Sequence, residues 1–250
     1  MLTKNTIKFI QSLQKKKNRD LSECFTAEGD RLVKDLIVFC KCKILVCTDS
    51  FLESLPVKPT AEEIIICDKN QLEKLSAQKS AQNAIAVFYQ IKREFSYESL
   101  DNKLSIALDT IQDPGNLGTI IRIADWFGID HVICSKETVD LYNQKTIQAT
   151  MGALSRVQVH YTDLHELLKN TTLPVYGTFL DGTNLYDEEL TPHGIIIMGN
   201  EGNGISQDIE NLVSSKLLIP GFPDEKPICE SLNVGVATSI ICAEFRRRFR

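Results

Sequence analysis

The chain has 250 residues, of which 43% are hydrophobic and 24% are charged, and its formal net charge is −5. A chain of this length can bury a substantial core, and its acidic balance excludes a protein coated throughout in basic surface. No run approaches the roughly 18–20 apolar residues of a membrane-spanning helix, and the amino terminus lacks the apolar core of a secretory signal. We therefore expect a cytoplasmic protein that has no membrane partner.

The first ~95 residues alternate between helix-like and strand-like text. Residues 7–13 and 31–37 have helical spacing, residues 25–29 resemble a short strand that enters a turn, and three further runs resemble strands: 43–47, 64–67 and 84–88. Residues 1–100 carry 16 Lys and Arg against 13 Asp and Glu, whereas residues 101–250 carry 12 against 20. This imbalance fits a nucleic-acid-binding module joined to a catalytic one, but on charge alone chance surface variation is the favoured explanation.

From Leu104 onwards the strand-like runs become fully apolar, which is typical of parallel strands covered on both faces. These runs are 104–108, 131–134, 175–179, 195–198 and 216–219. A helix is expected from about Asn116 to Trp126, with Gly128 in the left-handed conformation after it, and a last helix from about Asn233. We therefore expect an α/β fold with an amino-terminal domain over residues 1–95, a linker over 96–103 and a second domain over 104–250.

The eight cysteines are scattered, and several lie inside apolar runs, which favours reduced, buried thiols. Only Cys40, Cys42 and Cys47 form a cluster. Because no second group of ligands accompanies them, the sequence predicts no metal site.

Three loops follow predicted strands in the second domain, where ligands of open α/β sheets bind. The first is Asp113-Pro114-Gly115-Asn116, in which Asn116 could cap the following helix. Arg122 follows among isoleucines, so its guanidinium must reach either solvent, as a surface ion pair, or an anion.

The second loop runs from Gly199 to Gly204. Its glycine order is G-x-x-G-x-G rather than the G-x-G-x-x-G of dinucleotide-binding proteins, and it contains no Gly-Lys-Ser/Thr of a phosphate-binding loop. Glycines with two amide side chains and Glu201 favour a loop that surrounds a small ligand through backbone groups, the alternative being a plain helix start.

The third loop runs from Ile219-Pro220 to Asn233, and Ser231 or Asn233 could cap the last helix. Gly235, with small residues after it, would let another helix approach closely. Residues 221–230 form a Pro-rich, acidic insertion that could act as a lid.

These three segments, in this order, resemble the SpoU family of RNA ribose methyltransferases within the SPOUT superfamily. The resemblance is carried by Asp113-Pro114-x-Asn116-x-Gly118 with Arg122, by Gly199-Asn200-Glu201-Gly202, and by Ile219-Pro220 with Ser231-Leu232-Asn233-Val234. Residues 1 to about 95 also resemble the RNA-binding domain that precedes the catalytic domain in many members and is similar to a small ribosomal protein.

The resemblance implies a parallel sheet closed by a deep trefoil knot, and transfer of a methyl group from S-adenosylmethionine to a ribose 2′-hydroxyl of RNA. Ribosomal RNA (23S) is the expected substrate, with transfer RNA as the alternative. The residues implied in catalysis are Arg122, Asn116, Glu201, Ser231 and Asn233. Because a guanidinium stays protonated, Arg122 is expected to stabilise the developing alkoxide and an RNA phosphate rather than to act as a base.

The resemblance also assigns residues to binding. Those expected to hold the cofactor are Gly177, Thr178, Gly199, Asn200, Gly202, Ile219, Pro220, Ser231 and Leu232. Those expected to bind RNA are Lys15, Lys16, Lys17, Arg19 and Arg31, together with Arg122. A homodimer is implied as well, and the small, apolar last helix is compatible with it.

Three competing classes remain to be weighed. A nicotinamide-dependent enzyme is disfavoured by the glycine order, and a serine hydrolase by the lack of a Gly-x-Ser-x-Gly turn. A non-catalytic protein that binds RNA or the ribosome is disfavoured by the intact Arg122, Glu201 and Asn233. Binding of S-adenosylmethionine separates this last class from the enzyme.

Overall fold

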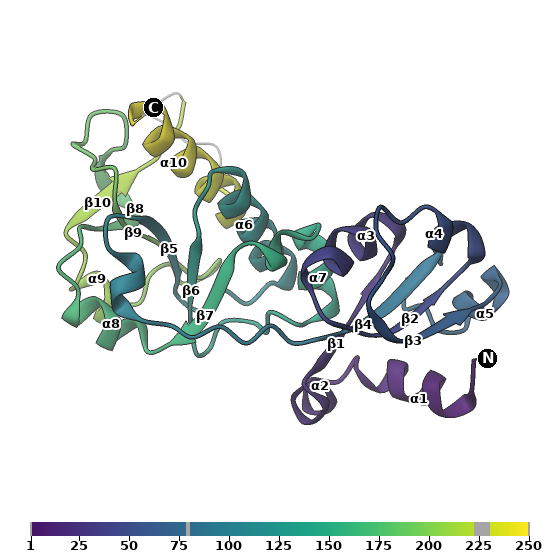
Figure 1. Cartoon of the computed structure of the whole chain (residues 1–250). Coiled ribbons are helices and arrows are strands. Elements are labelled where there is room, and N and C mark those ends of the chain that lie inside the picture. The colour runs from purple at the N-terminus through teal and green to yellow at the C-terminus, as the bar shows by residue number, and fades with distance from the viewer. Residues whose placement is uncertain (1, 79–80, 223–230, 250) are drawn as a thin grey trace. The chain divides into compact units, whose positions relative to one another are not determined.

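The computed structural model describes residues 2–78, 81–222 and 231–249. Most of the predicted 221–230 insertion, residues 223–230, therefore lies outside the described residues. Contacts within the chain divide it into two compact units, one made of residues 1–92 and 140–155 and the other of residues 93–139 and 156–250 (Figure 1). No helix in the described ranges combines the length and the apolar character needed to cross a bilayer.

The first unit is built on a four-stranded sheet with the order β1-β4-β2-β3, in which only β2 and β3 run parallel. Its strands are β1 (Cys24–Glu28), β2 (Cys42–Cys47), β3 (Ala61–Ile66) and β4 (Ala84–Tyr89). Its helices are α1 (Lys4–Ser12), α2 (Lys16–Ser22), α3 (Asp30–Phe39), α4 (Asp49–Glu53), α5 (Lys69–Glu73) and α7 (Gln144–Thr150), followed by the 3₁₀ turn η2 (Ala153–Ser155). The strands predicted at 25–29, 43–47, 64–67 and 84–88 are all present.

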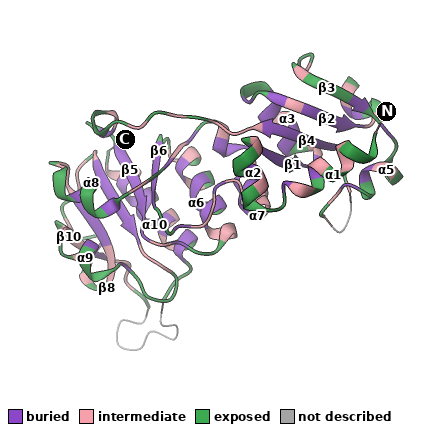
Figure 2. Ribbon diagram, turned by 90° about the horizontal axis from the view of Figure 1, so that it is seen from below, coloured by how far each residue is buried: buried purple, intermediate pink, exposed green. Residues whose placement is uncertain are grey.

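Apolar residues cover both faces of this sheet. On one face, Ile10 and Leu13 of the α1 segment pack with Ile44, Val46 and Ile85. Helices α3 and α7 contact β1, which explains why all five residues of this strand are buried (Figure 2).

The segment 140–155 belongs to the first unit although it lies between two strands of the second. The Arg19 guanidinium binds the Asp140 carboxylate at 2.6 Å, and the ring of Phe25 stacks on that of Tyr142 with centroids 4.9 Å apart. The Gln144 amide donates a hydrogen bond to the Glu28 carboxylate at 2.6 Å. These contacts are long-range, and no local feature of the sequence predicts them.

The second unit is an α/β domain with a six-stranded sheet in the order β10-β8-β9-β5-β6-β7. Every neighbouring pair is parallel, which confirms the prediction from the fully apolar runs. The strands are β5 (Leu104–Leu108), β6 (His131–Ser135), β7 (Gln158–Thr162), β8 (Val175–Asn184), β9 (Gly194–Met198) and β10 (Ser215–Leu218). The helices are η1 (Tyr97–Leu100), α6 (Pro114–Trp126), α8 (Leu164–Asn170), α9 (Gln207–Glu210) and α10 (Val234–Arg248).

Helices cover the two faces of this sheet. Leu164, Leu167 and Leu168 of α8 and Ile209 of α9 form one core with the sheet. Helices α6 and α10 pack against each other (Figure 1). The Phe245 ring of α10 meets that of Tyr176 on β8 edge to face.

Two local details differ from the sequence-based expectation. The cap of α6 is Asp113, whose carboxylate accepts the Asn116 backbone N–H at 2.8 Å, so the prediction that Asn116 caps this helix is wrong. Strand β7 was not predicted, because at the edge of the sheet only His160 of its five residues is buried and no apolar run marks it. Gly128 adopts φ +61°, as expected after the helix.

A buried histidine pair gives this unit a predictable response to acid. The rings of His131 and His160 stack with centroids 5.8 Å apart, and Phe95 packs on His160 at 4.8 Å. Burial lowers the pKa of both histidines, that of His160 to about 4; Arg93 lowers both further, Lys103 also lowers that of His131, and Asp130 opposes the shift.

We expect the free energy of unfolding to fall as the pH drops from about 6.5 to 4. In this range the histidines bind protons in the unfolded chain but stay neutral in the folded one. Above pH 6.5 both histidines are neutral in the folded and the unfolded chain, so they do not change the free energy of unfolding. Urea unfolding should show His160 contributing on the order of 2–3 kcal/mol to this fall. His160→Phe keeps the ring stack and should remove that part; an unchanged pH profile would contradict the prediction.

Candidate functional site

Side-chain hydrogen bonds join the three predicted loops of the second unit. The Asn116 amide nitrogen donates to the Glu201 carboxylate at 2.9 Å, and its amide oxygen accepts from the Asn233 amide nitrogen at 3.0 Å. Asn116 thus links residues that lie 85 and 117 positions further along the chain. Parallel strands bring these loops to one edge of the sheet, as their positions after β5, β9 and β10 predict.

The first loop is held by backbone groups as well. The Glu201 carboxylate accepts the backbone N–H groups of Gln112 and Asp113, both at 3.4 Å. Just before them, Thr110 adopts a left-handed φ of +60°, and its carbonyl oxygen accepts the Asn200 amide at 2.7 Å. Glu201 therefore fixes the start of α6 rather than projecting free.

The second loop turns back tightly on itself. The backbones of Asn200 and Gly204 exchange two hydrogen bonds of 2.9 Å, and the Asn200 side-chain oxygen accepts the N–H groups of Gly202 and Asn203. A β-carbon at Gly199 would lie 2.3 Å from the carbonyl carbon of Gly204, and Gly204 itself has φ +70°. Two of the glycines are thus dictated by the shape of the turn.

The third loop ends at Asn233, whose side-chain oxygen caps α10 by accepting the N–H groups of Gly235 and Val236. A β-carbon at Gly235 would lie 3.2 Å from the Thr119 side chain, which confirms the expected close approach of a second helix. The partner is α6, so this contact sets the loop at residue 233 against the loop at residue 113.

A cavity of about 770 Å³ opens between the second and third loops. Its charged lining consists of Glu201 and Glu210, and no Lys, Arg or His lines it among the described residues. The remaining lining residues are apolar, amide, hydroxyl or glycine: Thr178, Phe179, Leu180, Met198, Gly199, Asn200, Gly202, Asn203, Gly204, Ile205, Leu217, Leu218, Ile219, Ser231, Leu232, Asn233, Val234 and Ala237.

An irregularity in the sheet supplies one wall of the cavity. Strand β10 pairs Lys216 with Gly177 but the next residue, Leu217, with Thr183. The residues between Gly177 and Thr183 therefore leave the regular pairing, and Thr178, Phe179 and Leu180 among them line the cavity.

Nine of the predicted catalytic and cofactor residues line this cavity: Thr178, Gly199, Asn200, Glu201, Gly202, Ile219, Ser231, Leu232 and Asn233. Asn116 reaches the cavity only through its bonds to Glu201 and Asn233. Gly177 and Pro220 do not line it; a β-carbon at Gly177 would instead meet the side chains of Phe179 and Val213.

Sequence reasoning missed several lining residues. Phe179 and Leu218 directly adjoin the predicted Thr178 and Ile219, so adjacency alone could have suggested them. No sequence motif marks Glu210. It lies on the four-residue helix α9, whose position depends on its packing against α8.

Arg122 does not line the cavity. It is exposed on α6, and within the described part of the chain it forms neither a hydrogen bond nor an ion pair. Trp126 lies one helical turn further on, with 84% of its surface exposed. Six residues separate Arg122 from Asn116, which on a helix is about 9 Å along the axis and roughly 240° around it.

The predicted basic residues of the first unit behave differently from one another. Lys15, Lys16, Lys17 and Arg31 are exposed. Arg19 is 4% exposed, binds Asp140, and donates to the carbonyl oxygens of residues 13 and 14 at 2.9 Å. This burial disfavours the predicted RNA contact of Arg19, because its guanidinium is engaged in contacts within the first unit.

Three of the four carboxyl-terminal arginines lie in the described part of the chain, and all three are engaged within the protein. Arg246 donates to the carbonyl oxygen of Phe127 at 2.7 Å, Arg247 pairs with Glu244 at 2.7 Å, and Arg248 pairs with Glu244 and donates to the carbonyl oxygen of Leu185. These bonds hold the end of α10 in place.

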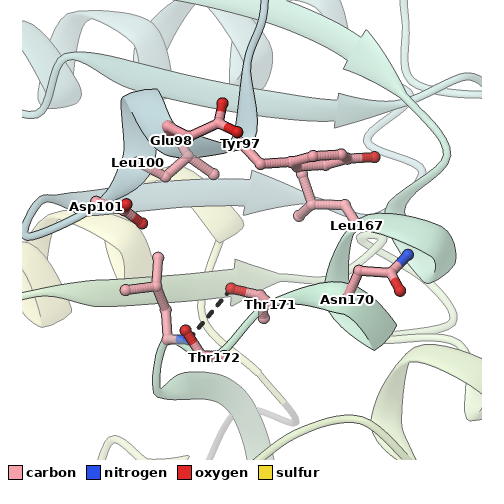
Figure 3. A pocket seen from close by; sticks show the side chains of 9 residues that line it. Tyr97, Glu98, Leu100, Asp101, Leu167, Asn170, Thr171 and Thr172 are labelled. Carbon is pink, nitrogen blue, oxygen red and sulfur yellow. Dashed lines mark hydrogen bonds between the residues drawn. The ribbon is translucent and has the colours of Figure 1, made fainter.

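A second, smaller hollow of about 120 Å³ lies between η1 and the end of α8 (Figure 3). Tyr97, Glu98 and Asn170 are among its lining residues, and Thr171 accepts the backbone N–H of Leu173 there at 3.2 Å. None of the three loops contributes to it. Across the described ranges, no group of three or more His, Cys, Asp or Glu side chains could hold a metal.

Comparison with known proteins finds a family model for each of two long segments of the chain. The model of the SpoU rRNA Methylase family matches residues 103–243, and the model of the MRM3-like substrate binding domain matches residues 4–86. The chain is 28% identical over 247 residues to the 23S rRNA (guanosine(2553)-2′-O)-methyltransferase RlmP of Bacillus subtilis. This alignment covers 96% of this chain and 95% of the relative.

Two solved structures share the whole architecture. One is a protein from Porphyromonas gingivalis assigned to the TrmH family of RNA methyltransferases, with a TM-score of 0.88, 36% identity and 99% of both chains covered. The other is an AdoMet-bound rRNA methyltransferase from Sinorhizobium meliloti, with a TM-score of 0.84, 27% identity, and 100% of this chain and 97% of the other covered. The SpoU family model matches more than half of this chain, and the three loops lie within the matched range. The chain therefore belongs to the SpoU rRNA methylase family.

Proposed function

We propose that this protein transfers a methyl group from S-adenosylmethionine to a ribose 2′-hydroxyl of RNA, with 23S ribosomal RNA as the substrate. The observation that carries the proposal is the Asn116–Glu201–Asn233 network, which joins three loops, two of which line one cavity. The names of the relatives support the choice of RNA: RlmP, and RlmB of Neisseria meningitidis, are 23S rRNA methyltransferases.

The cavity suits this cofactor in its volume and in the chemistry of its lining. A volume of about 770 Å³ lies within the range of small-molecule sites. Gly199, Gly202 and Gly204 line the cavity without a side chain to cover their backbone groups. A lining with two carboxylates and no described cation disfavours a polyphosphate nucleotide. S-adenosylmethionine, when bound, supplies a methyl group activated by a positively charged sulfur.

The protein's own residues would position the acceptor and stabilise its charge. Glu201 and Asn233 hold Asn116, and with it the start of α6, in one geometry. A 2′-hydroxyl becomes more nucleophilic as its oxygen gains negative charge, and a fixed guanidinium stabilises that charge. Arg122 is the cation proposed for this role, and it forms no hydrogen bond or ion pair within the described residues.

We further propose that the protein works as a homodimer in which Arg122 serves the cavity of the other copy. Within one chain Arg122 does not line the cavity. On the packed pair α6 and α10, Trp126 is 84% exposed and Val236 is 49% exposed, which suits an apolar interface. Apposing this surface to a second chain would bring a free guanidinium to a site that lacks one.

Three further features complete the proposal. The return of α10 onto α6 after β10 is compatible with a trefoil knot in the second unit. The first unit would bind the RNA substrate, as the match to the MRM3-like substrate binding domain suggests. The seven described cysteines are free and buried, which suits a reducing compartment such as the cytoplasm.

The exposed lysines at the start of α2 lead to a prediction. Replacing Lys15, Lys16 and Lys17 by glutamine should weaken RNA binding and reduce the slope of log K against log salt by up to about 2–3, because fewer phosphate counterions are released. Filter binding at several salt concentrations measures this slope.

A matched control removes the same charge elsewhere in the first unit. Lys58, Lys69 and Lys74 are also exposed, and their replacement by glutamine should leave the slope unchanged. Equal losses in both triple variants would show a general electrostatic effect and no RNA site at α2.

Two measurements test the proposed function itself. Calorimetric titration should show binding of S-adenosylmethionine, and mapping of 2′-O-methyl groups in total RNA incubated with the purified protein should identify a ribosomal nucleotide. Methylation of transfer RNA alone would replace the substrate assignment. A protein that binds RNA but ignores S-adenosylmethionine would be a non-catalytic binder, and the proposal would be wrong.

A further inference from the structure

The two carboxylates that line the cavity, those of Glu201 and Glu210, have different bonding partners. The Glu201 carboxylate is committed to Asn116 and to the backbone N–H groups of residues 112 and 113. The carboxylate of Glu210, on α9, is bound by the ammonium group of Lys216. Lys216 also faces Asp181 at 3.7 Å, so this cluster of one ammonium and two carboxylates keeps a net negative charge.

Three elements contribute to this cluster at the cavity wall: β10 carries Lys216, α9 carries Glu210 and β8 carries Asp181. Lys216 lies on β10, directly before the lining residues Leu217 and Leu218. Its ammonium group sits 4.7 Å from the ring centroid of Phe179, which also lines the cavity. Glu210 is contributed by α9, and its side chain is 25% exposed. The carboxylate is therefore held at the wall and partly shielded from solvent.

A held negative charge acts differently on the two forms of the proposed cofactor. The methyl donor carries a positive sulfur, whereas the product left after transfer carries a neutral thioether and is otherwise the same molecule. A carboxylate at the cavity wall attracts only the first form through this difference. With Lys216 offsetting part of the charge, the expected preference is about three- to tenfold.

We propose that Glu210, held by Lys216, is a specificity-determining residue that makes the cavity bind the sulfonium donor in preference to the thioether product. The inference rests on the proposed function. It gives the cavity a means of exchanging spent cofactor for fresh, because the attraction disappears when the methyl group leaves.

The experiment measures dissociation constants of S-adenosylmethionine and S-adenosylhomocysteine by calorimetry and uses their ratio, in which any general loosening of the wall cancels. Glu210→Gln should lower the preference for the donor about three- to tenfold. Lys216→Met keeps an unbranched stem against Phe179 but removes the offsetting charge, so it should raise the preference. Sinefungin, which carries an ammonium group near the position of the sulfonium, should follow the donor in both variants.

Asp208→Asn is the matched control, since Asp208 is exposed on the same helix and does not line the cavity. It should leave the ratio unchanged. A wild-type protein that binds neither cofactor form would overturn the proposed function. A wild-type protein that binds both, with the same ratio in Glu210→Gln, would overturn this inference alone.

Discussion

Arg122→Ala is expected to lower the rate of methyl transfer about 10²–10³-fold, as removal of a group that stabilises a developing oxyanion does. The dissociation constant of S-adenosylmethionine should change less than about twofold, because Arg122 does not line the cavity. Arg122→Lys should also lose most activity, since lysine lacks the planar, two-pronged geometry. Incorporation of a labelled methyl group, with calorimetry for cofactor binding, measures both effects.

Mixing two inactive variants tests whether Arg122 acts across the dimer. Chains carrying Arg122→Ala and chains carrying Glu201→Ala, refolded or exchanged together, should form mixed dimers with one intact composite site. About a quarter of wild-type activity should return, since half of the dimers are mixed and each has one good site. No recovery from demonstrably mixed dimers would place Arg122 in its own chain's reaction, and near-normal activity of Arg122→Lys would remove its proposed role.

Gly199→Ala is expected to abolish measurable cofactor binding and to destabilise the second unit by about 2–4 kcal/mol. The new β-carbon would lie 2.3 Å from the Gly204 carbonyl carbon and 2.4 Å from the Ile205 nitrogen. Both are backbone atoms that cannot rotate aside, so the turn at Asn200–Gly204 must open. Thermal unfolding and calorimetric titration of S-adenosylmethionine report the two losses separately.

Gly202→Ala is the control within the same loop. A β-carbon there would have only the Asn200 side-chain oxygen nearby, at 3.6 Å, which is ordinary contact. This variant should fold with near-normal stability. If both alanine variants bound the cofactor equally well, the close return of the chain at Gly199 would not matter for the site.

The strands of the second unit were predictable because their signal is local. Runs such as 104–108 and 195–198 are buried on both faces, so every position is apolar. Strand β7 escaped prediction because an edge strand needs no such run. The loops were also predictable, since Gly199 and Asn233 are required by turn and cap geometry that involves neighbouring residues.

The roles of the charged residues depended on distant partners. Arg19 belongs to a basic run in the sequence, yet it is buried because Asp140, 121 residues away, lies against it. Glu210 carries no motif, and its place at the cavity follows from the packing of α9 and its bond to Lys216. The residue type alone does not show whether a charged side chain is paired, buried or exposed.

By itself, the sequence determined the parallel strands and the three loops, because glycines, caps and apolar runs act over a few residues. The motifs in those loops also carry the resemblance to the family. Only the tertiary structure decided which side chains meet: Asn116 with Glu201 and Asn233, and Arg122 with no described partner. It also assigned residues 140–155 to the first unit. The physical reason is that burial and pairing are set by contacts between residues far apart in the chain.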